Sequence, residues 1–145
     1  MARAILYGGV VVGTLDLLDA LIFFGLRGTA PLRIFQSIAA GVLGRASYQH
    51  GLRSAALGIA LHYLIAVLIV TVFYLISRQW PLLVEHAIVS GIVYGIAVYF
   101  VMNCLVIPLS ATARGTFVLP IFVNGLLIHA FGVGLPSALF ARLYR

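Results

Sequence analysis

The sequence predicts an all-α fold, in which four helices form an integral membrane bundle and one short amphipathic helix lies at the membrane surface. Of its 145 residues, 63% are hydrophobic and 8% are charged, and the mean hydropathy is +1.18. Soluble domains carry about 25% charged residues. The apolar residues also form four blocks of about 20 residues or more, the length that a helix needs to cross a bilayer.

We expect one membrane domain over residues 1–145, with spans over residues 4–26, 53–77, 82–107 and 117–143. The first span ends where Arg27 and Gly28 interrupt the apolar run, and the third ends at Pro108. In the fourth span, Pro136 predicts a kink. The spans use almost the whole sequence, so no room is left for a soluble catalytic domain, and an enzyme is not the favoured interpretation.

Between the first two spans, residues 33–47 are too short to cross a bilayer comfortably, and Pro31 suits the first turn of a helix. One side of this helix is apolar, with Ile34, Phe35, Ile38, Val42 and Leu43. The other side is polar, with Arg33, Gln36 and Ser37. The pattern predicts a helix lying in the membrane interface, and a re-entrant segment is the alternative.

The net charge of +6 comes from nine arginines and no lysine, set against three acidic residues. The arginines are scattered along the sequence and form no basic stripe, so nucleic acid is not an expected partner. Arginines next to apolar spans instead indicate anchoring to the headgroups of a lipid bilayer. Because the arginines divide almost evenly between the two sides of the membrane, they give little indication of how the protein is oriented in it. We expect both termini in the cytoplasm.

Two acidic residues, Asp16 and Asp19, lie in the middle of the first span. A carboxylate near the centre of a bilayer is costly, and it marks a functional site by default. At a spacing of three residues both side chains share one helix face, about 5–6 Å apart. Two carboxylates this close do not both ionise easily, so the pair could hold a mobile proton.

Two histidines lie at the same predicted depth as Asp16. At 1.5 Å per residue, Asp16 is about 15 Å from the end of its span, and His62 and His129 are each about 14 Å from the matching ends of theirs. All three continue stripes of small residues, which mark close helix contacts in membranes. Tyr94, Asn103 and Asn124 lie on the same predicted polar track, and the two asparagines would form its access path.

Several functions fit such an Asp/His cluster. The leading interpretation is binding or transport of a proton or small cation, because acid–histidine chains form proton relays in membrane proteins. A structural cluster in an accessory or assembly subunit of a larger membrane complex, or in a homo-oligomer, is the alternative. A third is a cofactor site: a divalent metal held by Asp16, Asp19, His62 and His129, or haem b with His62 and His129 as axial ligands.

Short motifs over nearly the whole chain carry a resemblance to a known family: Gly13–Asp16, Pro31 with Gln36–Ala39, Leu61–His62, Tyr94–Gly95, Met102–Asn103, Pro108–Ser110, and His129 with Val133–Pro136. They resemble a family of small bacterial inner-membrane proteins of unknown function. The resemblance implies a four-span protein of the bacterial inner (plasma) membrane and supplies no activity. Its motifs include Asp16, His62, Asn103 and His129.

Overall fold

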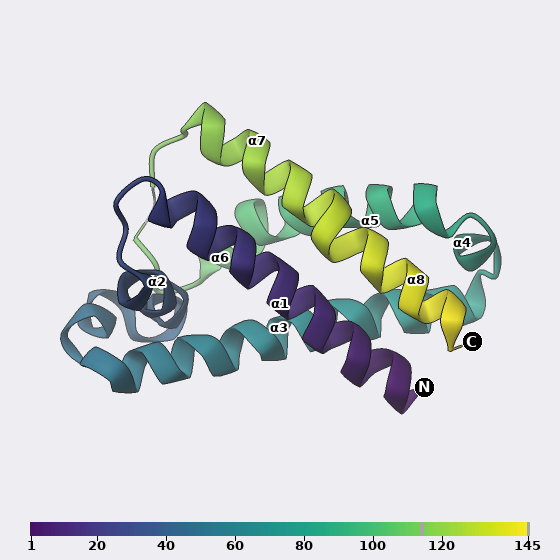
Figure 1. Ribbon diagram of the computed structural model, residues 1–145, viewed down its shortest axis with the longest axis horizontal. Coiled ribbons are helices and arrows are strands. Elements are labelled where there is room, and N and C mark those ends of the chain that lie inside the picture. The colour runs from purple at the N-terminus through teal and green to yellow at the C-terminus, as the bar shows by residue number, and fades with distance from the viewer. Residues whose placement is uncertain (114, 145) are drawn as a thin grey trace.

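The computed structural model describes residues 1–113 and 115–144, and these residues form helices joined by turns and loops. Four helical stretches are long and apolar enough to cross a membrane: Ala2–Gly25, Gly51–Gln79, Ala87–Leu109 and Leu119–Leu143. They run along the molecule, and the first begins at the same end where the last finishes (Figure 1). The predicted all-α class and the four long apolar helices are confirmed.

The first two long stretches are single helices, α1 (Ala2–Gly25) and α3 (Gly51–Gln79). The third joins α5 (Ala87–Val101), η2 (Met102–Val106) and α6 (Ile107–Leu109), and the fourth joins α7 (Leu119–Ile128), η3 (His129–Gly134) and α8 (Leu135–Leu143). Shorter elements lie between them: α2 (Pro31–Leu43), η1 (Gly44–Gln49) and α4 (Leu82–Glu85).

Wide π turns, η2 and η3, end two residues before Pro108 and Pro136, respectively. A proline inside an α-helix lacks an N–H donor, and its ring clashes with the carbonyl four residues earlier. The wider turn relieves both problems, so the helix continues through Pro108 to Leu109 instead of ending at residue 107 as predicted. The fourth stretch likewise continues through Pro136.

The third long helix begins at Ala87, later than the predicted residue 82. His86 leaves the helical conformation, with φ −104° and ψ 44°, and separates α4 from α5. The Ser90 hydroxyl donates hydrogen bonds to the carbonyls of Leu83 and His86 at this break. These side-chain bonds satisfy carbonyl groups at the break, which coincides with Glu85 and His86 in the sequence.

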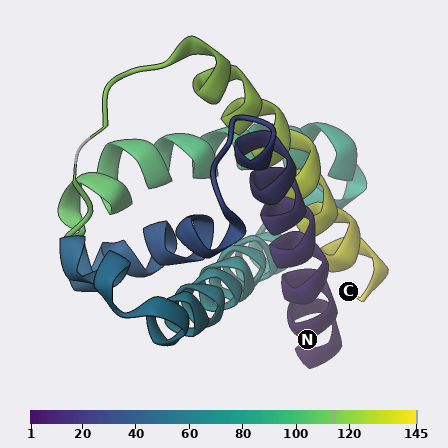
Figure 2. The same ribbon diagram turned by 60° about the vertical axis from the view of Figure 1, so that its left-hand side comes forward.

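Helix α2 lies across one end of the four long helices. It is seen end-on in Figure 1 and lengthwise in Figure 2, against the beginning of α3. It starts at Pro31 and ends at Leu43, because Gly44 adopts φ +58°, and η1 follows in place of the helix predicted up to residue 47. The orientation agrees with a surface helix and differs from that of the long helices.

The buried face of α2 differs from the predicted apolar face. Gln36, expected on the polar outer side, is 2% exposed, whereas Val42 is 63% exposed. The Gln36 side-chain amide donates to the Gly51 carbonyl at 3.1 Å, and the backbone carbonyl of Gln36 accepts from the Ser47 hydroxyl at 2.6 Å. The Ser54 hydroxyl donates to the Ser47 carbonyl at 2.6 Å. This buried network fixes α2 and η1 to α3 by hydrogen bonds rather than by apolar contact alone.

Glycines allow the third and fourth stretches to touch backbone to backbone. A methyl group on Gly134 would overlap the carbonyl oxygen of Gly91, and one on Gly95 would overlap the carbonyl oxygen of His129. At the α2 contact, a methyl on Gly58 would overlap the carbonyl of Phe35. Such close approach by small residues is typical of helix packing within membranes.

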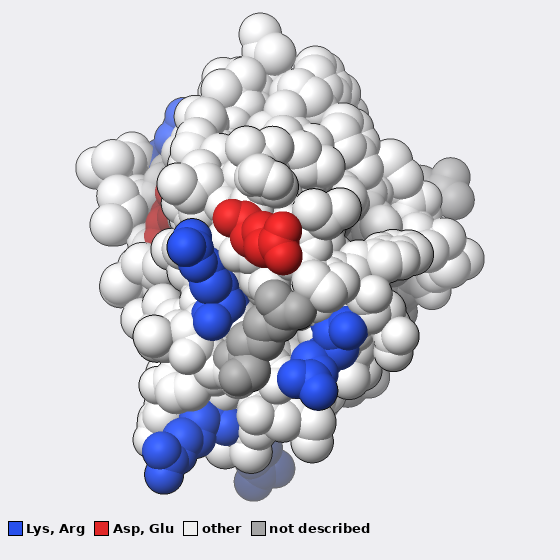
Figure 3. Space-filling model, turned by 90° about the vertical axis from the view of Figure 1, so that its right-hand side faces the viewer, with Lys and Arg blue, Asp and Glu red and all other residues white. Residues whose placement is uncertain are grey.

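The end that holds the start of α1 contains a tightly packed core cluster. Its members are Ala4, Phe73, Tyr74, Val84, Ala87, Ala138 and Ala141, each at most 5% exposed. The outward faces of the long helices are apolar as well, as in α3 with Leu64, Leu68, Val72 and Leu75. Arginine and acidic side chains are both exposed on the face at this end (Figure 3).

Candidate functional site

A cavity of about 670 Å³ lies between the long helices on the side of α2. Residues of α1, α2, α3, α7 and the third stretch form its walls, and most of them are apolar or aromatic. Six of the seven residues selected from the sequence line it: Asp16, Asp19, His62, Asn103, Asn124 and His129. The predicted polar track therefore coincides with an open space inside the bundle.

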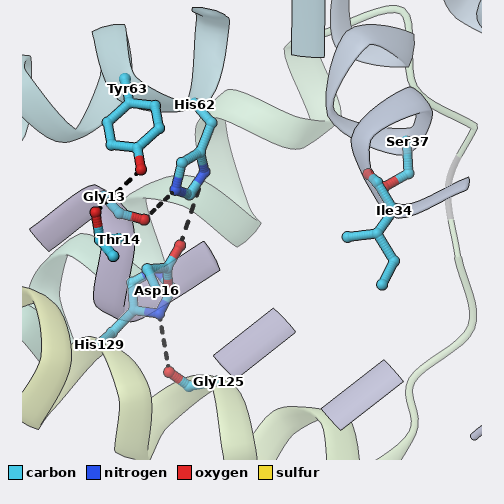
Figure 4. Close-up of polar contacts among 9 residues, drawn as sticks. All are labelled: Gly13, Thr14, Asp16, Ile34, Ser37, His62, Tyr63, Gly125 and His129. Atoms are coloured by element: carbon cyan, nitrogen blue, oxygen red, sulfur yellow. Dashed lines mark hydrogen bonds and ion pairs between the residues drawn. The ribbon is translucent and has the colours of Figure 1, made fainter. Parts of the chain in front are cut away.

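Asp16 and His62 face each other from α1 and α3 (Figure 4). The His62 Nδ1 atom is 4.0 Å from an Asp16 carboxyl oxygen, and its Nε2 atom is 2.7 Å from the carbonyl oxygen of Gly13. The side chains are 12% and 28% exposed for His62 and Asp16, respectively. The two helices meet here because Gly13 leaves space for Tyr63 and Ala66 of α3.

The Gly13 carbonyl determines which nitrogen of His62 carries a hydrogen. A carbonyl oxygen can only accept, so Nε2 must donate. In a neutral imidazole Nδ1 then has a lone pair, and that lone pair faces the Asp16 carboxylate across 4.0 Å. Two electron-rich groups repel at this distance, whereas one proton on either of them makes the contact attractive. A proton on either group would therefore let the pair form an ionic contact.

His129 adds a second imidazole close to Asp16. Its Nδ1 atom donates to the Gly125 carbonyl at 2.9 Å, one helical turn earlier (Figure 4). In the neutral ring the Nε2 atom is then the acceptor. The ring of Tyr99 packs edge-on against His129 with centroids 5.4 Å apart. Asp16 thus has an ion-pair contact with His62 of α3, and His129 of η3 lines the same cavity.

Asp19 has a different partner. The side-chain amide of Asn124 in α7 donates to its carboxyl oxygen at 2.7 Å. The sequence predicted two carboxylates acting as one pair, but each is directed to another helix: Asp16 to α3 and Asp19 to α7. Asn124 therefore holds a carboxyl group, a role beyond the access path that the sequence predicted for it.

The other two predicted residues do not contact the acids. The Asn103 amide donates to the carbonyl of Tyr99 in its own helix at 2.9 Å, and its side chain lines the cavity. The Tyr94 hydroxyl donates to the Ile69 carbonyl at 2.7 Å, and its ring packs on Phe73 with centroids 5.0 Å apart. Tyr94 is not among the residues that line the cavity. Its contacts are those of a packing residue.

The sequence did not identify every side chain around the site. Arg33 lines the α2 side of the cavity, with its guanidinium 5.2 Å from the ring centre of Tyr48. Thr14 and Tyr63 share a hydrogen bond of 3.0 Å beside the Gly13–His62 contact. Arg33 could have been found from its place on the amphipathic helix. The Thr14–Tyr63 contact depends on how two distant helices meet, which no local pattern reveals.

The cofactor interpretations gain no support from these contacts. Within residues 1–113 and 115–144, no three side chains of His, Cys, Asp or Glu gather in a group that could hold a metal ion. For haem, His62 would have to give up its bond to Gly13 or turn away from Asp16. The arrangement suits proton exchange between acid and imidazole better than axial ligation.

Comparison with known proteins adds no relative to this picture: no family model, curated protein or solved structure matches the chain.

Proposed function

We propose that the chain is a multi-pass membrane protein whose four long helices span the bilayer, with α2 lying in its interface. The proposal is supported by the length and hydropathy of these helices and by their apolar outer faces. Large exposed apolar surfaces of this kind need a nonpolar surrounding. The crosswise position of α2 and its arginine suit the headgroup region.

We further propose the bacterial inner membrane, with both termini in the cytoplasm. This part of the proposal rests on the sequence resemblance and on the distribution of the arginines. An even number of spans brings both termini to one side. Fusions of each terminus to a reporter that is active only outside the cytoplasm would test the orientation. Activity of that reporter at either terminus would refute a cytoplasmic location of both termini.

The function that the site supports best is reversible binding of a proton for transport across the membrane. The observation that carries this proposal is the Asp16–His62 contact, in which the Gly13 carbonyl turns the Nδ1 atom of His62 toward the carboxyl group. Asp16 would be the principal acceptor. His62 and His129 would pass the proton on, and Asp19, held by Asn124, would lie on the way to the α2 side.

We infer that protons reach this site from the α2 side. The cavity lining includes residues of α2, and the cavity also borders the buried apolar cluster of Val12, Ala66, Val70, Val98 and Val133, three of which line it. A site open to one side and closed to the other is what a carrier with alternating access requires. Protons would enter from the α2 side in this state and leave after the apolar cluster opens.

Substitution of Asp16 by Asn tests the proposal. The amide keeps the size of the side chain but cannot take up and release a proton. In liposomes loaded with a pH-sensitive dye, we expect the wild-type protein to dissipate an imposed pH gradient and Asp16→Asn to lose at least about 90% of that flux. Glu85→Gln, which removes an exposed carboxylate outside the cavity, is the matched control and should keep the flux.

Unchanged flux in Asp16→Asn would refute the proton-binding role. Stable co-purification with other chains, together with that result, would favour the accessory-subunit alternative, in which the cluster only fixes the bundle. Circular dichroism of each variant in detergent checks that the helices are intact. A folded Asp16→Asn protein without flux is the result that we expect.

A further inference from the structure

The cavity is larger and more apolar than a proton site requires. Its volume is about 670 Å³, whereas a water molecule in the liquid occupies about 30 Å³. Pockets that bind small organic molecules typically measure about 300–1,000 Å³ and have apolar walls with a few polar groups. Size and lining both match that class of site.

The charges around the cavity select the sign of a ligand. Three lining residues have side chains that can carry a full charge at neutral pH: Asp16, Asp19 and Arg33. The two carboxyl groups lie on α1 beside the deeper part, while the guanidinium of Arg33 lies on α2 near the ring of Tyr48. A cationic group would therefore find carboxylates inside the cavity, and an anionic group would be repelled by them.

The apolar part of the wall suits a hydrocarbon body next to that cationic group. Phe23, Met102 and Tyr99 line the cavity together with branched aliphatic residues. Aromatic faces attract cations, and apolar walls favour removal of hydrocarbon from water. A small hydrated metal cation would gain nothing from such walls.

We propose that this cavity binds an amphiphilic organic cation, with its positive group at Asp16 and Asp19 and its apolar body against the aromatic and aliphatic wall. This inference deepens the proposed function and rests on it in one respect, because the carboxyl groups that bind the proton would also pair with the cation. The ligand class is a hydrophobic ammonium or phosphonium compound.

A pair of probes with the same shape and opposite charge tests the inference. Tetraphenylphosphonium and tetraphenylborate each carry four phenyl rings and differ in the sign of the charge. In equilibrium dialysis against the purified full chain in mild detergent, we expect saturable binding of tetraphenylphosphonium and at least about tenfold weaker binding of tetraphenylborate. Equal binding of the two ions would overturn the inference, since it would show partition by hydrophobicity alone.

Variants locate the binding in the cavity. Asp16→Asn combined with Asp19→Asn should weaken tetraphenylphosphonium binding at least about tenfold, and Glu85→Gln should leave it unchanged. Ala20→Leu places extra volume in the cavity and should also weaken binding. Ala60→Leu, at an exposed position of α3 away from the cavity, is its control. Binding that survives both cavity changes in folded protein would overturn the inference.

The proton flux in liposomes, measured without any organic cation, separates this inference from the proposed function. If proton flux depends on Asp16 but tetraphenylphosphonium does not bind specifically, the proposed function still stands and the inference is overturned. Specific binding without flux supports the cation site and refutes the proton transport. A phospholipid retained in purified protein that tetraphenylphosphonium cannot displace would identify a lipid as the occupant and would also overturn the inference.

Discussion

The two ends of the bundle are built differently. Near the start of α1, the helices pack through alanines, glycines and a few large rings, and the core residues there are at most 5% exposed. Near α2, the same helices enclose a cavity of about 670 Å³ lined by acids, histidines and amides. Both ends are formed by the same four apolar stretches, so the class of helix does not explain the difference.

The size of the side chains at the helix contacts explains it. Where Gly91, Gly95 and Gly134 meet, the backbones touch and leave no room for a methyl group. Toward α2, the larger side chains of Tyr99, Phe23 and Met102 line the cavity, although Gly58 still allows a backbone contact between α3 and α2. Small residues thus close the contact between the third and fourth stretches, and larger side chains border the open space.

The largest effect is expected where the closed end begins. Gly134→Ala would push a methyl group into the Gly91 carbonyl, and backbone atoms cannot move aside as a side chain can. We expect the free energy of unfolding to fall by about 3 kcal/mol or more, or the protein to fail to fold. Thermal unfolding followed by circular dichroism in detergent measures it. Gly25→Ala, where no atom lies within 4 Å of the added methyl, should be neutral or slightly stabilising, and equal losses in both variants would contradict the packing explanation.

A pair of identical substitutions compares the two ends directly. Ala4→Leu, at a position with 0% exposure in the packed cluster, should cost about 1–3 kcal/mol through overpacking. Ala20→Leu, in the wall of the cavity, should leave the apparent melting temperature unchanged or raise it, because filling a cavity commonly stabilises by about 0.5–2 kcal/mol. If both variants lose stability equally, the cavity does not provide the free space described.

The smallest effect concerns Tyr94, which lies at the closed side of the comparison. Removing its hydroxyl in Tyr94→Phe deletes the hydrogen bond to the Ile69 carbonyl and keeps the ring on Phe73. We expect a loss of about 0.5–1.5 kcal/mol in unfolding measurements and retention of proton flux in liposomes. A large fall in flux with unchanged stability would return Tyr94 to the proton path that the sequence suggested.

Much of the fold could be predicted because the apolar blocks are long and their interruptions are few. The boundaries were less predictable near prolines and serines. Pro108 is accommodated by a π turn rather than ending the helix, and Ser90 stabilises the break that follows Glu85. Each depends on hydrogen bonds between particular residues, which hydropathy does not record.

The sequence predicted which residues belong to the candidate site but not which of them contact one another. Depth along each helix follows from residue counting, and this selected Asp16, His62 and His129 together. The partners depend on how the helices are rotated and how far apart they stand. Thus Asp19 faces Asn124 rather than Asp16, and Gln36 is buried against α3 although it belongs to the polar side of its helix.

The sequence by itself determined that the chain forms four long apolar helices with ionisable groups at one level, because hydropathy and helical rise are local properties. The tertiary structure alone decided that these groups surround a cavity, that His62 directs its Nδ1 atom to Asp16, and that the opposite end is closed. The physical reason is that packing depends on which side chains meet across helices, and the residues that meet are far apart in the chain.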